Sequence, residues 1–114
     1  MKELSKREKK IAREIIEKGV QAEFKAGLEK AKQVITEWET GALNNRDGYH
    51  KLVKEIEDHD KIIQRRYDGL TGSRYLVTVA AILFDKQISE EEIEGFSDEA
   101  KQSIRNWISF WNED

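Results

Sequence analysis

The sequence predicts an all-α protein in which two long amphipathic helices precede a compact head of short helices. Three observations predict this fold. The chain has no proline, the residue that most strongly interrupts helices. Apolar residues recur at helical spacing through its first half. The one unbroken apolar run, Tyr75 to Phe84, is followed by short segments that carry helix-capping residues. With 114 residues, the chain is expected to form a single domain over residues 1–114.

The first helix is expected to begin at Ser5. Ser5 and Glu8 have the S-x-x-E spacing of a capping box, in which each side chain accepts a hydrogen bond from the other residue's backbone N–H. The helix should end near Gly41. A seam typical of a coiled coil follows its second half, at steps of four, three, four and three residues: Phe24, Leu28, Ala31, Ile35 and Trp38.

A second helix is expected from about Asp47 to Tyr67. Asp68–Gly72 should then break or sharply bend the chain, because its glycines favour turns. Ser73 is placed to cap a third helix that ends near Phe84. This helix is apolar on nearly all sides and should be buried on more than one face. Its β-branched residues also suit a short strand, but no second strand is predicted to pair with it.

Two further helices are expected at the C-terminus. Ser89 and Glu92 form a second capping box, opening a short helix that Gly95 ends. Ser97 caps the last helix, which carries three clustered aromatic residues: Trp107, Phe110 and Trp111. Core or dimer packing explains such a cluster, and an exposed cluster would instead favour a partner surface.

Composition limits the classes of function. Hydrophobic and charged residues each make up 38% of the chain, so helices of this kind often complete their core with a second copy. The absence of cysteine excludes disulfides and thiolate metal sites. The apolar run is too short for a membrane span, and the charged N-terminus lacks a signal-peptide pattern. We therefore expect a cytoplasmic protein that does not bind membranes.

Charge is unevenly distributed along the chain. Residues 1–19 carry seven basic and four acidic residues, whereas residues 85–114 carry three basic and nine acidic residues. The acidic end argues against a nucleic-acid surface, and solvated helix faces explain both ends most simply.

No catalytic motif is present, and neither a cofactor nor a metal is expected. The chain lacks a G-x-S-x-G elbow, and Gly69–Ser73 lacks the lysine of a phosphate-binding loop. His59, near Asp58 and Asp60, lies on the apolar stripe of its helix and could act as a metal ligand or a base. His50 lies nine positions away, too far to share one ion easily within a monomer. A histidine that packs in a core or an interface is the simpler interpretation.

The chain resembles the fluorescence recovery protein family, small all-α photoprotection regulators of cyanobacteria. Ser5-x-x-Glu8 and the residues after it resemble that family's first long helix. Ile63 followed by Tyr67-Asp68 resembles its "I-D-x-K-Y-D" element, and Arg74-Tyr75 resembles the "R-Y" start of its next apolar helix. Ser89-Glu90-Glu91 with Glu94 to Ser97 resembles its "T-E-E-D-L-x-G-L-S" ending. The resemblance implies a helical homodimer without enzymatic activity. It also implies binding to a carotenoid-binding protein, whose return to the resting state such regulators accelerate.

The residues of the family's functional surface are not kept. Its tryptophan falls on His50, its histidine and aspartate on Val53 and Lys54, and its arginine on Asp60, which reverses two charges. The scaffold is thus expected to be shared while the partner differs.

We expect a non-enzymatic dimeric regulator or adaptor that binds a protein. The predicted partner-binding residues are His50, Lys54, Glu57 and Asp60. The residues predicted to pack in the dimer or core are Phe24, Leu28, Ile35, Trp38, Tyr67, Trp107 and Trp111. The alternatives are a structural oligomerisation module of a larger assembly and a metal-binding protein that uses His50 and His59.

Overall fold

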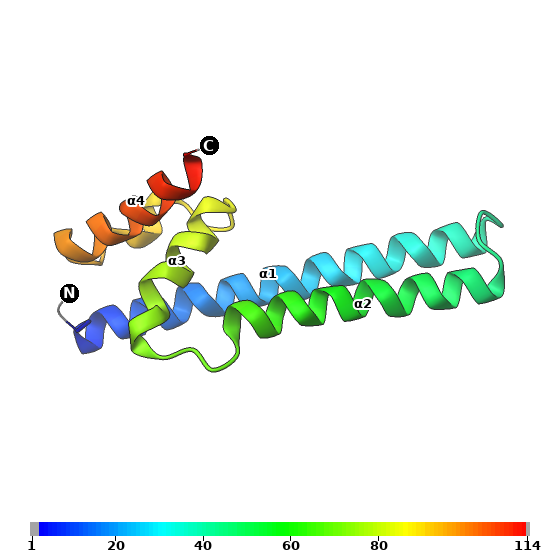
Figure 1. Ribbon diagram of the computed structural model, residues 1–114, viewed down its shortest axis with the longest axis horizontal. Coiled ribbons are helices and arrows are strands. Elements are labelled where there is room, and N and C mark those ends of the chain that lie inside the picture. The colour runs from blue at the N-terminus through cyan, green and yellow to red at the C-terminus, as the bar shows by residue number, and fades with distance from the viewer. Residues whose placement is uncertain (1–2, 114) are drawn as a thin grey trace. The chain divides into compact units, whose positions relative to one another are not determined.

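The computed structural model describes residues 3–113. In this range the protein is 80% helical and has no strand, as the all-α prediction requires. The α-helices are α1 (Lys6–Glu39), α2 (Asn45–Tyr67), α3 (Tyr75–Phe84) and α4 (Asp98–Asn112), and two 3₁₀ turns, η1 (Gly72–Arg74) and η2 (Glu90–Ile93), flank α3 and α4 (Figure 1).

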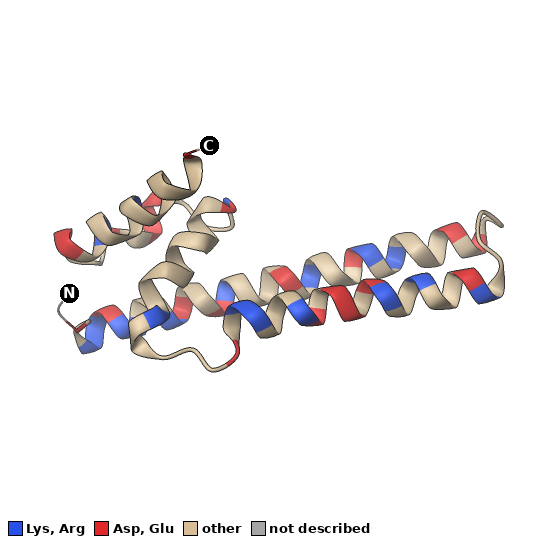
Figure 2. Cartoon of the chain, in the orientation of Figure 1, with Lys and Arg blue, Asp and Glu red and all other residues tan. Residues whose placement is uncertain are grey.

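The chain forms two compact units, and α1 contributes to both. One unit, the hairpin, is Val20–Asp68 and contains the part of α1 from Val20 onward and all of α2. The other unit, the head, combines the described parts of Met1–Gly19 and Gly69–Asp114. Charged residues follow one another along α1 and α2, whereas α3 carries none (Figure 2).

The turn of the hairpin is specified by two short motifs. Gly41 has φ of +86°, and the Ala42 N–H donates to the Glu37 carbonyl at 2.9 Å, the bond that closes a Schellman-type helix end. The Asn44 side chain then accepts a hydrogen bond from the Asp47 N–H at 2.8 Å. Asn44 is therefore the N-cap, and α2 begins two residues before the predicted Asp47.

Glycines set how closely the two helices of the hairpin approach each other. Gly48 of α2 lies under Trp38, since a Cβ at Gly48 would stand 3.2 Å from the Trp38 Cβ. His59 of α2 packs on Gly27 of α1 in the same way, since a Cβ at Gly27 would stand 3.3 Å from the His59 Cγ. Each helix thus supplies one ring that packs on a glycine of the other. These contacts fix the register of the antiparallel pair, which Figure 1 shows side by side.

The core of the head is built around α3. This helix is buried on several sides, as its composition predicted. Its buried residues are Leu76, Thr78, Val79, Ala80, Ile82 and Leu83. Ala12 and Ile15 of α1, Ile93 and Phe96 of the η2 segment, and Ala100 and Ile104 of α4 are also buried.

The first turn of α1 is tied to the start of α4 by one carboxylate. The Ser5–Glu8 capping box forms as predicted, with backbone-to-side-chain distances of 3.0 and 3.1 Å. The second Glu8 oxygen accepts a hydrogen bond from the Ser97 N–H at 3.0 Å, and Ser97 itself caps α4 through the Ala100 N–H. The Ser97 and Ser5 N–H groups lower the pKa of the Glu8 carboxyl.

The segment between the hairpin and α3 is a break rather than a bend. Helix α2 ends at Tyr67, and Gly69 has φ of +66°, a conformation that favours glycine. The prediction that Ser73 caps α3 is wrong. Ser73 lies inside η1 and its hydroxyl pairs with that of Thr71 at 2.9 Å, while α3 starts without a side-chain cap. The predicted Ser89–Glu92 capping box forms only in part: the Ser89 N–H donates to the Glu92 carboxylate, whose pKa is lowered by the Lys18 ammonium and by this N–H, but the Ser89 side chain does not cap the 3₁₀ turn η2.

Candidate protein-binding surface

The hairpin exposes most of its large apolar side chains. Phe24 is 48% exposed and Leu28 is 71% exposed, while Ile35 and Trp38 are also on the surface. With Ala31 between Leu28 and Ile35, these residues recur every three or four positions, so helical periodicity places them on one side of α1. Helix α2 adds a parallel row of exposed residues, Tyr49, Val53 and Ile56. Together the two rows form what we call the apolar stripe.

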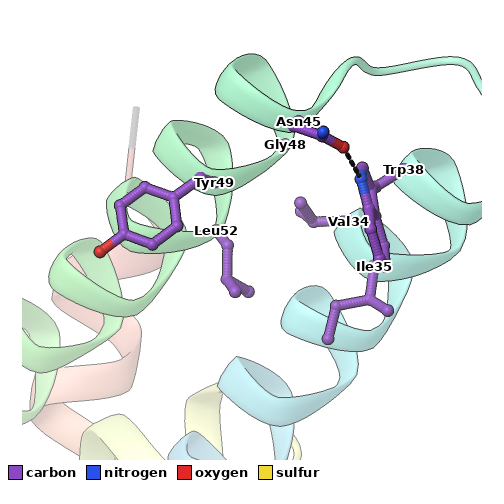
Figure 3. Close-up of a pocket in the computed structure, with 7 residues that line it drawn as sticks. All are labelled: Val34, Ile35, Trp38, Asn45, Gly48, Tyr49 and Leu52. Carbon is purple, nitrogen blue, oxygen red and sulfur yellow. Dashed lines mark hydrogen bonds between the residues drawn. The ribbon is translucent and has the colours of Figure 1, made fainter.

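Both rows of the apolar stripe lie on the same side of the hairpin. A hollow of about 400 Å³ opens between the two helices near the turn. It is lined from α1 by Val34, Ile35 and Trp38 and from α2 by Asn45, Gly48, Tyr49 and Leu52 (Figure 3). The Trp38 indole N–H donates to the Asn45 Oδ1 at 2.7 Å, which holds the ring at the rim of the hollow (Figure 3). The stripe therefore continues from one helix to the other.

The four predicted partner-binding residues lie along one exposed edge of α2, beside the apolar stripe. His50, Lys54, Glu57 and Asp60 are all exposed. The Lys54 ammonium donates to the Asp58 carboxylate at 3.0 Å, and this hydrogen bond raises the pKa of Lys54. We call these four residues the charged edge. Basic residues occupy its first half and acidic residues its second half.

A polar cluster crosses the hairpin at the level of Gly27. The Glu23 carboxylate lies 3.7 Å from the His59 Nδ1 and 3.8 Å from an Arg66 guanidinium nitrogen. Both Glu23 and His59 are largely buried, and the His59 Nδ1 makes no hydrogen bond in the structure. Within residues 3–113, no group of three or more His, Cys, Asp or Glu side chains converges as metal ligands would.

Aromatic side chains also gather on the head. Trp107 and Trp111 have ring centroids 5.9 Å apart, Trp107 and Phe110 are 6.3 Å apart, and Phe84 of α3 contacts Trp111 at 5.6 Å. Phe110 is 63% exposed, whereas Trp111 is half-buried. A second hollow of about 400 Å³ lies beside Phe84 and Ile108. We call Phe84, Trp107, Phe110 and Trp111 the aromatic patch.

The predicted packing residues are thus mostly on the surface of the single chain. Phe24, Leu28, Ile35, Trp38 and Trp107 are exposed, and Tyr67 and Trp111 are half-buried. Their periodicity identified them as a packing surface, but it cannot tell an internal core from a surface that needs a second molecule.

Sequence reasoning missed three polar contacts that organise the chain. These are the Glu8–Ser97 bond, the Glu23–His59–Arg66 cluster and a 2.8 Å ion pair between Lys18 and Glu92. The Lys18 ammonium lowers the pKa of Glu92. Each contact joins residues far apart in the sequence, and no local pattern signals such a pairing.

Comparison with known proteins found no matching family model, no matching curated protein and no matching solved structure. Among the described residues, none of the helices combines the length and apolar character that crossing a membrane requires.

Proposed function

We propose that this chain is a non-enzymatic, homodimeric regulator or adaptor of the cytoplasm that acts by binding proteins through its helical hairpin. The observation that carries this proposal is the apolar stripe. Val34, which is 3% exposed, is the only buried apolar side chain of residues 20–68, all of which the structure describes. The larger side chains of the seam face outward instead.

A hairpin of this kind gains little stability from its own contacts. Burying a large apolar side chain contributes about 2 kcal/mol, so leaving a row of them in water forgoes much of the available free energy. Two helices joined by a short turn are stabilised when their common apolar face packs on further helices. A second copy of the hairpin supplies such a face, since each copy would cover the other.

The charged edge gives this surface selectivity. Its four side chains are exposed on α2 outside the apolar stripe, so they stay accessible when a second copy covers the stripe and present a defined order of charges to a protein partner. Relative to fluorescence recovery proteins, which the chain resembles, two charges in this region are reversed. We therefore propose the scaffold of those regulators with a different partner preference, rather than recognition of the same carotenoid-binding protein.

The charged edge is tested by reversing charge at two positions. The double variant Lys54→Glu/Asp60→Arg should retain its helix content and nearly all of its stability, because both side chains are exposed and the Lys54–Asp58 bond that it loses is a surface ion pair. It should lose at least about tenfold in affinity for a protein partner captured by the wild-type chain. The matched control reverses Lys30 to Glu and Glu29 to Arg, two exposed residues of α1. Unchanged capture by the first variant would contradict the role of the charged edge.

The aromatic patch favours a second candidate, a structural oligomerisation module that docks through the head. Deleting residues 97–114 is a poor test, because it also removes the buried Ala100 and Ile104 of α4. Phe110→Ser is cleaner, since the ring is mostly exposed. If the head mediates assembly, this variant should lower the sedimentation coefficient while a stripe variant, Ile56→Ser, should not. The opposite result assigns assembly to the hairpin.

A further inference from the structure

We infer that the head binds a short acidic segment of another protein through a basic surface that the start of α1 forms with the η1 turn before α3. This surface belongs to a different unit from the hairpin, so the inference does not depend on the proposed dimer. We call it the basic face, and its residues are Lys6, Lys9, Lys10, Arg13 and Arg74.

The α1 part of the basic face lies opposite the side of the helix that packs in the head. Lys6, Lys10 and Arg13 recur at steps of four and three residues, and all three are exposed. Ala12 and Ile15, on the other side of this segment, are buried. Figure 2 shows Lys and Arg residues, in blue, along the first turns of α1. The apolar side of the segment is used by the core, so what the segment offers to a partner is positive charge.

The segment before α3 extends the basic face. Lys9 reaches the 3₁₀ turn η1, since a Cβ at Gly72 would stand 3.9 Å from the Lys9 Cε. The exposed Arg74 ends this turn. The Arg13 Nε donates to the Tyr75 hydroxyl at 3.3 Å, and the Arg13 Cζ lies 5.9 Å from the centre of the Tyr75 ring. These contacts bring cations from two distant parts of the sequence onto one surface.

The cations of the basic face are not neutralised by carboxylates of the head. Within residues 3–113 none of the five forms an ion pair, whereas Lys18 of the same helix pairs with Glu92 at 2.8 Å. The bond to Tyr75 uses the Nε of Arg13, which leaves the two terminal nitrogens of the guanidinium to donate. A carboxylate is the group that such a pair of donors binds best. The basic face therefore suits Asp and Glu side chains of a partner.

The position of these charges also opposes the stability of the helix that carries them. A helix N-terminus favours acidic residues, but three of the first four residues of α1 are basic. Lys6 with Lys10, and Lys9 with Arg13, are like-charged pairs four residues apart, a spacing at which equal charges repel. A bound acidic segment would relieve both costs. Sequence choices that break local rules without an internal compensation are typical of binding surfaces.

The charge of the rest of the head favours a short acidic segment over a long polyanion. Residues 85–114 carry nine acidic and three basic residues. A nucleic-acid backbone or an anionic bilayer would extend beyond the basic face and be repelled by this negative charge. Binding of α1 to a bilayer would also need a free apolar side, and Ala12 and Ile15 are buried in the head. A peptide with a few carboxylates can cover the basic face alone.

A defined acidic peptide tests the basic face. A fluorescently labelled polyglutamate peptide of about ten residues should bind the wild-type chain, with fluorescence anisotropy measured at about 0.15 M salt. The variant Lys6→Glu/Lys10→Glu should bind it at least about tenfold more weakly. The matched control, Lys30→Glu/Lys32→Glu, changes two exposed residues of the same helix by the same charge and should stay within about twofold of wild type. Absence of binding by the wild-type chain, or an equal loss in both variants, would overturn the inference.

Neutral substitutions separate a binding surface from a solvated helix face. Lys6→Gln/Lys10→Gln removes cations from the helix N-terminus, so its urea midpoint of unfolding should be at least as high as that of wild type. The same variant should still lose at least about fivefold in affinity for the peptide. A lower midpoint would show that the cations support the fold, and unchanged affinity would show that they do not bind the peptide. Either result contradicts the inference.

Two further probes distinguish the class of partner. Phosphatidylserine vesicles and a single-stranded RNA of about ten nucleotides, compared at an equal concentration of negative charge, should each bind at least about tenfold more weakly than the peptide. Binding of either probe as tightly as the peptide would overturn the assignment to an acidic protein segment. None of these measurements involves the hairpin surface, so this inference and the proposed function can fail separately.

Discussion

The Glu8 carboxylate accepts backbone hydrogen bonds at the N-termini of two helices, α1 and α4. One oxygen completes the capping box with Ser5, and the other accepts the Ser97 N–H at the start of α4. Helix N-termini favour negative charge, and a carboxylate satisfies donors that would otherwise lack a partner. Glu8 therefore links segments that are distant in sequence without being buried in the core.

Replacing Glu8 with Ala should destabilise the protein by about 1 kcal/mol at pH 7, since two hydrogen bonds to a partly exposed carboxylate are lost. The folded-state pKa of Glu8 is lowered, so its contribution is complete above the unfolded-state pKa of about 4.3. As the pH falls through the folded-state pKa, the contribution disappears. Urea unfolding at pH 7 and pH 3 measures both effects.

Glu14→Ala is the matched control for the Glu8 variant, because Glu14 is an exposed residue of the same helix without a capping bond to a distant backbone N–H. Its unfolding free energy should stay within about 0.5 kcal/mol of wild type. A difference between Glu8→Ala and wild type that persists undiminished at pH 3 would contradict the carboxylate link.

Among the elements, those with local signals were the ones that could be predicted. Ser5, Ser97 and Gly41 mark helix ends because each acts on backbone groups a few residues away. The prediction for Ser73 was wrong for a local reason as well. Its hydroxyl pairs with that of Thr71, and the chain makes a 3₁₀ turn at Ser73 before α3 begins. Helix α2 begins two residues before the predicted start because Asn44, a residue type typical of turns, also caps helices well.

The exposure of the α1 seam could not be predicted from its spacing. Phe24 to Trp38 show the periodicity of a packed helix, and the structure shows that α2 packs instead against the neighbouring side of α1, on Gly27 and Val34. Glycine at position 27 lets His59 approach beside Phe24 and Leu28 rather than on them, whereas Trp38, at the end of the seam, packs on Gly48 of α2. The distinction depends on tertiary contacts that a single helix pattern does not contain.

The solvent-accessible surface area of the chain is large for a protein of its mass. The chain exposes 8091 Å², whereas a folded monomer of 13.3 kDa typically exposes about 6,500 Å². A protein–protein interface of standard size buries about 800 Å² on each partner. The excess is therefore more than enough to supply one such interface, and the apolar stripe is where the hairpin exposes side chains suited to it.

The central claim is that the apolar stripe of the hairpin joins two copies of the chain, and Leu28→Glu with sedimentation equilibrium tests it most directly. Leu28 is 71% exposed in the single chain, so the variant should keep its helix content while its dimer dissociation constant rises by at least about a hundredfold. Gln33→Glu, on the opposite side of α1, is the control and should remain dimeric. A Leu28→Glu protein that stays as dimeric as wild type would contradict the claim.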